Sequence, residues 1–96
     1  MDAERILSVG EQGVHLLFDR AAITAAFAAD PERLREVVAT RRPELEAALG
    51  EILSLDRAEQ ARALIAELPP ELRHVLVLLY FEILERRIAH RQPSLH

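Results

Sequence analysis

Residues 75–84 read VLVLLYFEIL, and nine of these ten residues are apolar. A helix on the surface of a globular protein needs only one apolar stripe, but this stretch is apolar nearly all the way round. With about 3.6 residues per turn, the first apolar face of the predicted helix consists of Leu72, Val75, Leu76, Leu79 and Ile83. The second apolar face consists of Val77, Phe81, Leu84 and Ile88, with Tyr80 at its margin. Two apolar faces need two covers.

The second face could be covered in two ways. The helix could be the central helix of a monomer, or a second molecule could pack against it. The other predicted helices are short and rich in alanine, which favours a second molecule. An uncovered face of this size would exceed the apolar patches that monomers usually expose. We therefore predict an interface that consists of Val77, Tyr80, Phe81, Leu84 and Ile88, with Arg86 and Arg87 at its rim.

The composition of the chain indicates an all-α fold. Alanine and leucine are abundant, and β-branched residues are scattered rather than gathered into strands. Short connections between the predicted helices imply antiparallel neighbours in a compact bundle. We predict a single helical domain over residues 1–96, in which about five short helices surround the long C-terminal helix. Segments 1–12 and 92–96 are expected to be frayed.

The N-terminal part of the chain contains two helix signals. A short helix over 2–9 is expected to end at Gly10. The segment 14–29 is expected to be helical with a break near Asp19, because an aspartate there could cap the second half. A strand over 14–18 is the alternative, since four of these five residues are apolar, but it would have no partner strand.

Prolines and aspartates mark the remaining helices. The dipeptide Asp30–Pro31 is typical of a helix start. The next helix is expected over 43–53, where leucine and isoleucine recur at helical spacing. Asp56 and Glu59 have the spacing of a capping box, with aspartate in place of serine. The dipeptide Pro69–Pro70 predicts the start of the long last helix.

The sequence carries no signature of catalysis or metal binding. It contains no cysteine, so disulfides and cysteine-based metal sites are excluded. The four histidines, which form no metal-binding motif, are His15, His74, His90 and His96. No serine–histidine–aspartate arrangement, P-loop or dinucleotide motif can be argued. We therefore expect a protein that is not an enzyme and that holds neither a metal nor a cofactor.

The charge and the hydropathy of the chain predict its surroundings and partners. A net charge of −4 disfavours nucleic acid as a partner. The longest apolar run is shorter than the roughly 20 residues that span a membrane, and the residues MDAERILSVG lack the apolar core of a signal peptide. We therefore expect a cytoplasmic protein that binds no membrane. Its predicted function is that of a small adaptor or regulator, which associates with itself as a dimer or with another protein.

Residues 68–82, LPPELRHVLVLLYFE, resemble the first helix of region 4 of the bacterial sigma factors, which binds DNA. Such regions often have a Leu-Pro start and a helix rich in valine and leucine that ends in Tyr-Phe-Glu. The family continues with a glycine-containing turn and a basic recognition helix, whereas ILERRIAHR continues the same helix here. No DNA-contacting role is therefore assigned to these residues. The resemblance implies a small DNA-binding transcriptional regulator as one alternative function. A carrier of an apolar ligand, held between alanine-rich helices, is another.

Overall fold

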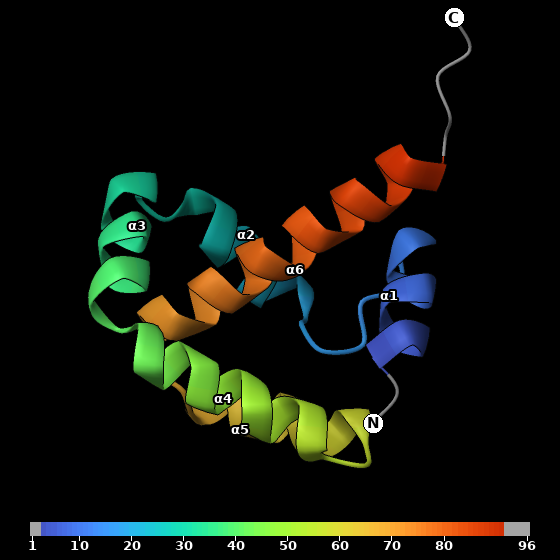
Figure 1. The fold of residues 1–96 in the computed structure, drawn as a ribbon, viewed down its shortest axis with the longest axis horizontal. Coiled ribbons are helices and arrows are strands. Elements are labelled where there is room, and N and C mark those ends of the chain that lie inside the picture. Colours follow the sequence, from blue (N-terminus) through green and yellow to red (C-terminus); the bar gives the residue numbers. More distant parts are fainter. Residues whose placement is uncertain (1–2, 92–96) are drawn as a thin grey trace, which may run out of the picture.

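A computed structural model describes the backbone of residues 3–91 and the side chains of residues 3–90. This part of the chain contains six helices and no strand (Figure 1). The helices are α1 (Ala3–Glu11), α2 (Arg20–Ala28), α3 (Pro31–Thr40), α4 (Arg42–Ser54), α5 (Ala58–Glu67) and α6 (Pro70–Arg91). The predicted all-α bundle, with short helices around a long C-terminal helix, is thereby confirmed.

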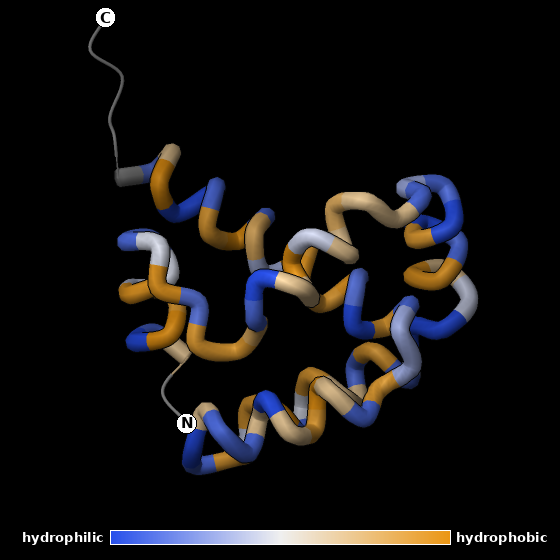
Figure 2. The backbone as a smooth tube through the Cα atoms, turned by 180° about the vertical axis from the view of Figure 1, so that it is seen from behind, coloured by the Kyte–Doolittle hydropathy of each residue, from blue (hydrophilic) through white to orange (hydrophobic). Residues whose placement is uncertain are grey.

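The long helix α6 crosses the middle of the molecule (Figure 1). Helix α2 packs along its rear side, α3 packs on its N-terminal half, and α1 lies beside its C-terminal half. Helices α4 and α5 pack against each other on the remaining side. Figure 2 shows that hydrophobic and hydrophilic residues alternate along the short helices, as expected for helices that bury one side.

Both apolar faces of α6 are covered mainly by the chain itself. On the second face, Val77 is 0% exposed and Leu84 is also buried. Their cover comes from α2, which packs on α6, and from the end of α1, where Gly10 lies against Leu84. On the first face, Leu76 is buried but Ile83 is 37% exposed. Each face thus has a buried part and an exposed residue near its C-terminal end, Ile83 on the first face and Ile88, at 38% exposed, on the second.

Two predicted helix caps are confirmed by their hydrogen bonds. The carboxylate of Asp19 accepts a hydrogen bond of 2.7 Å from the backbone N–H of Ala22, at the start of α2. The carboxylate of Asp30 accepts one of 3.1 Å from the N–H of Glu32, at the start of α3. Each satisfies a backbone donor that the first turn of a helix leaves without a partner.

Three predicted boundaries are wrong. The segment 14–18 forms neither helix nor strand, because it is held by tertiary contacts that bury Phe18 in the core. Helix α1 does not end at Gly10 but runs one residue further, and Gly13, with a φ of 90°, makes the turn that follows. Asp56 does not cap α5, which begins at Ala58 and has no side-chain cap.

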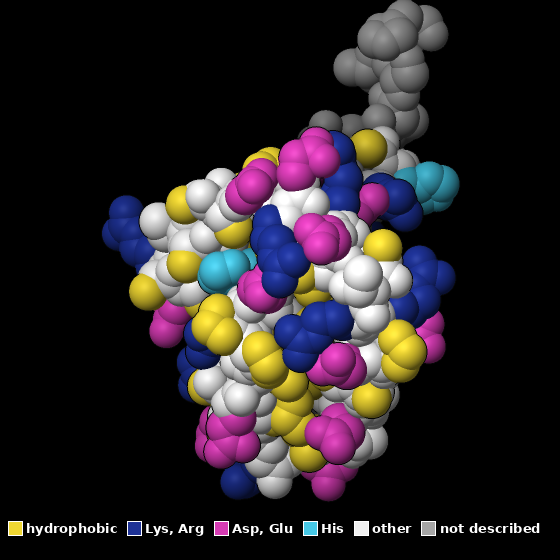
Figure 3. Space-filling view, turned by 90° about the vertical axis from the view of Figure 1, so that its left-hand side faces the viewer, with side chains coloured by type: hydrophobic (Ala, Val, Ile, Leu, Met, Phe, Trp, Pro, Cys, Tyr) yellow, Lys and Arg dark blue, Asp and Glu magenta, His cyan; other side chains and the backbone are white. Residues whose placement is uncertain are grey.

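Charged side chains cover much of the surface in pairs of opposite sign. On the face shown in Figure 3, arginines alternate with acidic residues, and a narrow band of hydrophobic side chains lies among them. Hydrogen bonds from Arg33 hold the pKa of Glu71 below its ordinary value, and Arg41 has the same effect on the pKa of Glu44. Exposed pairs of this kind contribute little to stability, so the apolar contacts of α6 hold the fold together.

Candidate functional site

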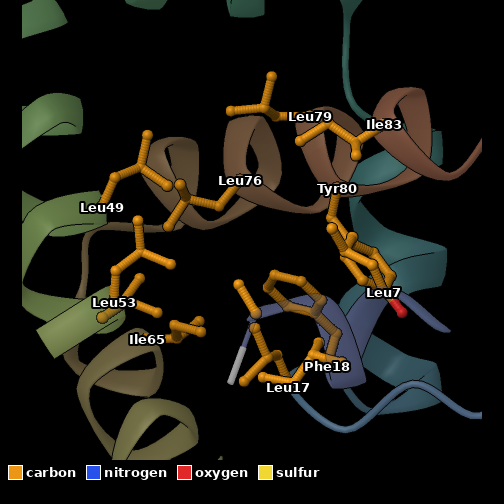
Figure 4. A pocket seen from close by; sticks show the side chains of 13 residues that line it. Leu7, Leu17, Phe18, Leu49, Leu53, Ile65, Leu76, Leu79, Tyr80 and Ile83 are labelled. Carbon is orange, nitrogen blue, oxygen red and sulfur yellow. The ribbon is translucent and has the colours of Figure 1, made fainter. Parts of the chain in front are cut away.

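An apolar pocket of about 320 Å³ opens between α1, α4 and α6 (Figure 4). Its lining comes from these three helices, from α5 and from the segment before α2. The floor consists of lining residues that are buried, namely Ile6, Phe18, Ile52, Ile65, Leu76 and Tyr80. The walls consist of the more accessible lining residues, namely Ala3, Leu7, Leu17, Leu49, Leu53, Leu79 and Ile83.

The pocket connects the surface of the molecule with its core. Two large apolar side chains at its mouth are well exposed, Leu53 at 54% and Ile83 at 37%. Figure 4 shows Leu49 and Leu53 on one side, Leu76 above, and Phe18 and Leu17 opposite, with their side chains directed into the space between them. The incompletely covered part of the first face of α6 therefore borders a hollow rather than a flat surface.

The only polar side-chain atom among the lining residues is the hydroxyl oxygen of Tyr80. This hydroxyl forms a hydrogen bond of 2.8 Å with Nδ1 of His15. Burial raises the pKa of Tyr80 above its ordinary value. The described lining residues therefore bring no charged group and no unpaired hydroxyl to the pocket, and their surface is complementary to hydrocarbon.

Polar contacts fasten α1, one wall of the pocket, to α6. The guanidinium of Arg87 donates hydrogen bonds of 3.0 and 2.8 Å to the two carboxylate oxygens of Glu4. It also donates bonds of 3.2 and 3.0 Å to one carboxylate oxygen of Glu11, whose side chain is only 4% exposed. These hydrogen bonds raise the pKa of Arg87 above its ordinary value, and the bonds to Glu4 have a larger effect than those to Glu11. Arg87 is thus a fixed positive charge between two carboxylates of α1.

The structure places the predicted interface residues in different environments. Those buried within the chain are Val77, Tyr80 and Leu84. Those that remain accessible at the surface are Phe81, Ile88 and Arg86. Arg86 pairs with Glu82 at 2.7 Å and its side chain is 77% exposed, whereas Arg87 pairs with Glu4 and Glu11 of α1. The intermolecular role of this group stays a prediction, and only its accessible members could meet a partner in the folded chain.

Two features of the surface were not predicted. Phe27 of α2 is 60% exposed, and its ring packs against Phe81 with a centroid distance of 5.5 Å. The pocket itself has no sequence signal, because its lining residues read as ordinary core residues.

Other types of site find little support among the described residues. They contain no group of three or more histidines and carboxylates that could hold a metal ion. None of the helices in residues 3–91 is long and apolar enough to cross a membrane. Helix α6 continues unbroken past Glu82 to Arg91, so the turn and second helix of the sigma-factor pattern do not follow it.

Comparisons with known proteins add no further information. The chain matches no protein-family model, no curated protein and no solved structure.

Proposed function

We propose that this chain is a non-enzymatic binding protein that carries a small, uncharged, apolar ligand in the pocket between α1, α4 and α6. The observation that supports this proposal is the lining of the pocket, which is hydrocarbon except for one phenol whose hydroxyl is already hydrogen-bonded to His15. Ligand pockets in proteins have volumes of roughly 300–1,000 Å³, so a cavity of about 320 Å³ suits a small ligand.

The affinity of such a pocket would come from the hydrophobic effect. Each Å² of apolar surface removed from water contributes about 25 cal/mol, and water gains little from a cavity that offers it no hydrogen-bond partners. A charged group on the ligand would lose its hydration inside the pocket and find no counter-charge there. The expected ligand therefore has a hydrocarbon body, and any polar group on it would remain at the mouth near Leu53 and Ile83.

A pair of fluorescent probes tests this chemistry. N-phenylnaphthylamine is uncharged, whereas anilinonaphthalene sulfonate has the same rings and an added sulfonate. The first should bind saturably with one site per chain, and the second more weakly. Because Tyr80 is the only tyrosine and the chain has no tryptophan, its fluorescence reports directly on the pocket. The proposal is rejected if neither probe saturates, or if the sulfonate binds better than the uncharged amine.

Replacing Ile83 with aspartate should weaken binding of N-phenylnaphthylamine by about tenfold, or ~1.4 kcal/mol. The new carboxylate would lie at the mouth of an apolar pocket. A bound ligand would displace part of the water around this carboxylate, and the lost hydration would oppose binding. Ile88→Asp is a matched control, because both residues lie on α6 and are 37% and 38% exposed, but only Ile83 lines the pocket. Titration of probe fluorescence measures both variants, and equal losses of affinity would contradict this site.

Self-association is a second candidate function. The observation that favours it is the exposed ring of Phe27, which packs on Phe81. Aromatic side chains are common anchors of protein interfaces, and the accessible members of the predicted interface, Phe81 and Ile88, lie on the second face of α6. The partner would be a second copy of the chain. This candidate uses the opposite side of α6 from the pocket, so the two functions are compatible.

Light scattering across a concentration series tests self-association. The chain should form a dimer, and Phe27→Glu should convert it to a monomer with unchanged circular dichroism, because a residue that is 60% exposed is not needed for folding. Val14→Glu is a control at another half-exposed apolar residue, in the segment before α2. A monomeric chain at high concentration, or an unchanged mass for Phe27→Glu, would rule this interface out.

A further inference from the structure

The apolar pocket is complete only while α1 stays against α6. Helix α1 supplies Ala3, Ile6 and Leu7 to the lining, and Figure 4 shows Leu7 on the side opposite α4. Without α1, the space between α4 and α6 would be an open groove. The pocket is open at its mouth near Leu53 and Ile83, so the hold on α1 determines how completely the pocket encloses a bound ligand.

Helix α1 depends for its stability on contacts with the rest of the chain. It has nine residues, and helices shorter than about 12–15 residues are marginal in water without tertiary contacts. Ile6 is its one large buried side chain. Its C-terminal end is followed by Gly13, which adopts a φ of 90°, and by a segment without regular structure up to Asp19. The turn at Gly13 provides the pivot about which α1 could swing, because His15 and Phe18, further along, are packed against Tyr80.

The ion pairs of Arg87 with α1 involve both ends of this helix. Glu4 lies in the first turn of α1 and Glu11 is its last residue, and both carboxylates accept hydrogen bonds from Arg87. A single guanidinium fork thereby ties the whole length of the helix to α6. The two carboxylates differ in environment, since the Glu4 side chain is 71% exposed and that of Glu11 is 4% exposed. The outer half of this contact is open to ions from the solvent.

We propose that α1 is a gate over the apolar pocket and that Arg87 is the positioning residue that keeps it closed. The gate's effect on ligand exchange rests on the proposed function, whereas the release of α1 does not. Closing the gate joins the side chains of Ile6 and Leu7 to the lining, and opening it exposes the groove between α4 and α6. Since Glu4 is largely exposed, salt should weaken the closed state by screening its attraction to Arg87.

Hydrogen exchange of backbone amides tests the gate with a matched pair of arginine variants. Arg87→Gln removes the fork that holds α1, and Arg86→Gln removes a neighbouring ion pair to Glu82 that does not touch α1. Arg87→Gln should raise exchange in α1 by about tenfold relative to Arg86→Gln, with exchange in α4 unchanged. Arg87→Lys keeps the charge but not the fork and should restore part of the protection. Equal exchange in α1 for the Arg86 and Arg87 variants would overturn the proposal.

The release rate of N-phenylnaphthylamine provides the second measurement. Arg87→Gln and high salt should each speed its dissociation from the full chain, whereas Arg86→Gln should not. If Arg87→Gln fails to fold, Glu4→Gln tests the same contact from an exposed position and should speed exchange and release less strongly. A probe that never binds rejects the proposed function while the amide exchange still tests the gate. A probe that binds but leaves at the same rate from all variants rejects the gate alone.

Discussion

Replacing Val77 with aspartate is expected to abolish folding, with a loss of more than about 4 kcal/mol. Val77 is 0% exposed and lies on the second face of α6, and the core residues of the described part of the chain are hydrophobic. A carboxylate at this position would be removed from water without a counter-charge, and the loss of a packed valine would add to that effect. Circular dichroism and thermal unfolding measure the result.

A change from isoleucine to aspartate at position 88 is the control for this prediction. Ile88 belongs to the same face but is 38% exposed, so the change should alter stability by less than about 1 kcal/mol. If Val77→Asp instead gave a folded monomer from a wild-type dimer, the second face would be covered by another molecule and not by α2. The pair of variants therefore decides between the two covers that the sequence alone left open.

Replacing Gly10 with alanine is expected to destabilise the fold by about 1–3 kcal/mol, even though alanine favours helices. A Cβ atom on Gly10 would overlap the hydroxyl of Tyr80 and would lie 3.1 Å from a methyl group of Leu84. Neither neighbour moves easily, since both are buried, and the hydroxyl is also hydrogen-bonded to His15. Urea unfolding of the variant would measure the loss.

Gly50 provides a control with the opposite sign. It lies in the interior of α4, where an added Cβ atom would meet nothing within 4 Å, so Gly50→Ala should stabilise the chain by about 0.5–1 kcal/mol. In the Gly10→Ala background, Tyr80→Phe removes the overlapping oxygen and should recover part of the lost stability. The close approach of α1 to α6 is contradicted if both glycine variants stabilise the chain, or if the double variant shows no coupling.

Local sequence signals were sufficient for most of the helical architecture. The aspartates at positions 19 and 30 cap α2 and α3 as predicted, because a capping side chain acts on backbone groups only a few residues away. The double proline at 69–70 marks the start of α6 as predicted, with Pro70 as the first residue of the helix. Local signals gave the wrong secondary structure where contacts with distant residues determine the backbone conformation. The segment 14–18 is irregular because Phe18 and His15 pack against Tyr80, more than sixty residues further along the chain.

The pattern of apolar residues by itself determined that α6 has two apolar faces and lies at the centre of an all-α bundle, because periodicity and composition are properties of the local chain. Only the tertiary structure decided what covers those faces. The second face lies under α2 and the end of α1, at a distance that only a glycine at position 10 permits. The first face is left partly open at Leu79 and Ile83. The pocket lies beside these residues because α1 and α4 do not cover this part of α6 completely. The space between helices depends on how side chains from distant segments interlock, and no periodicity along the sequence records it.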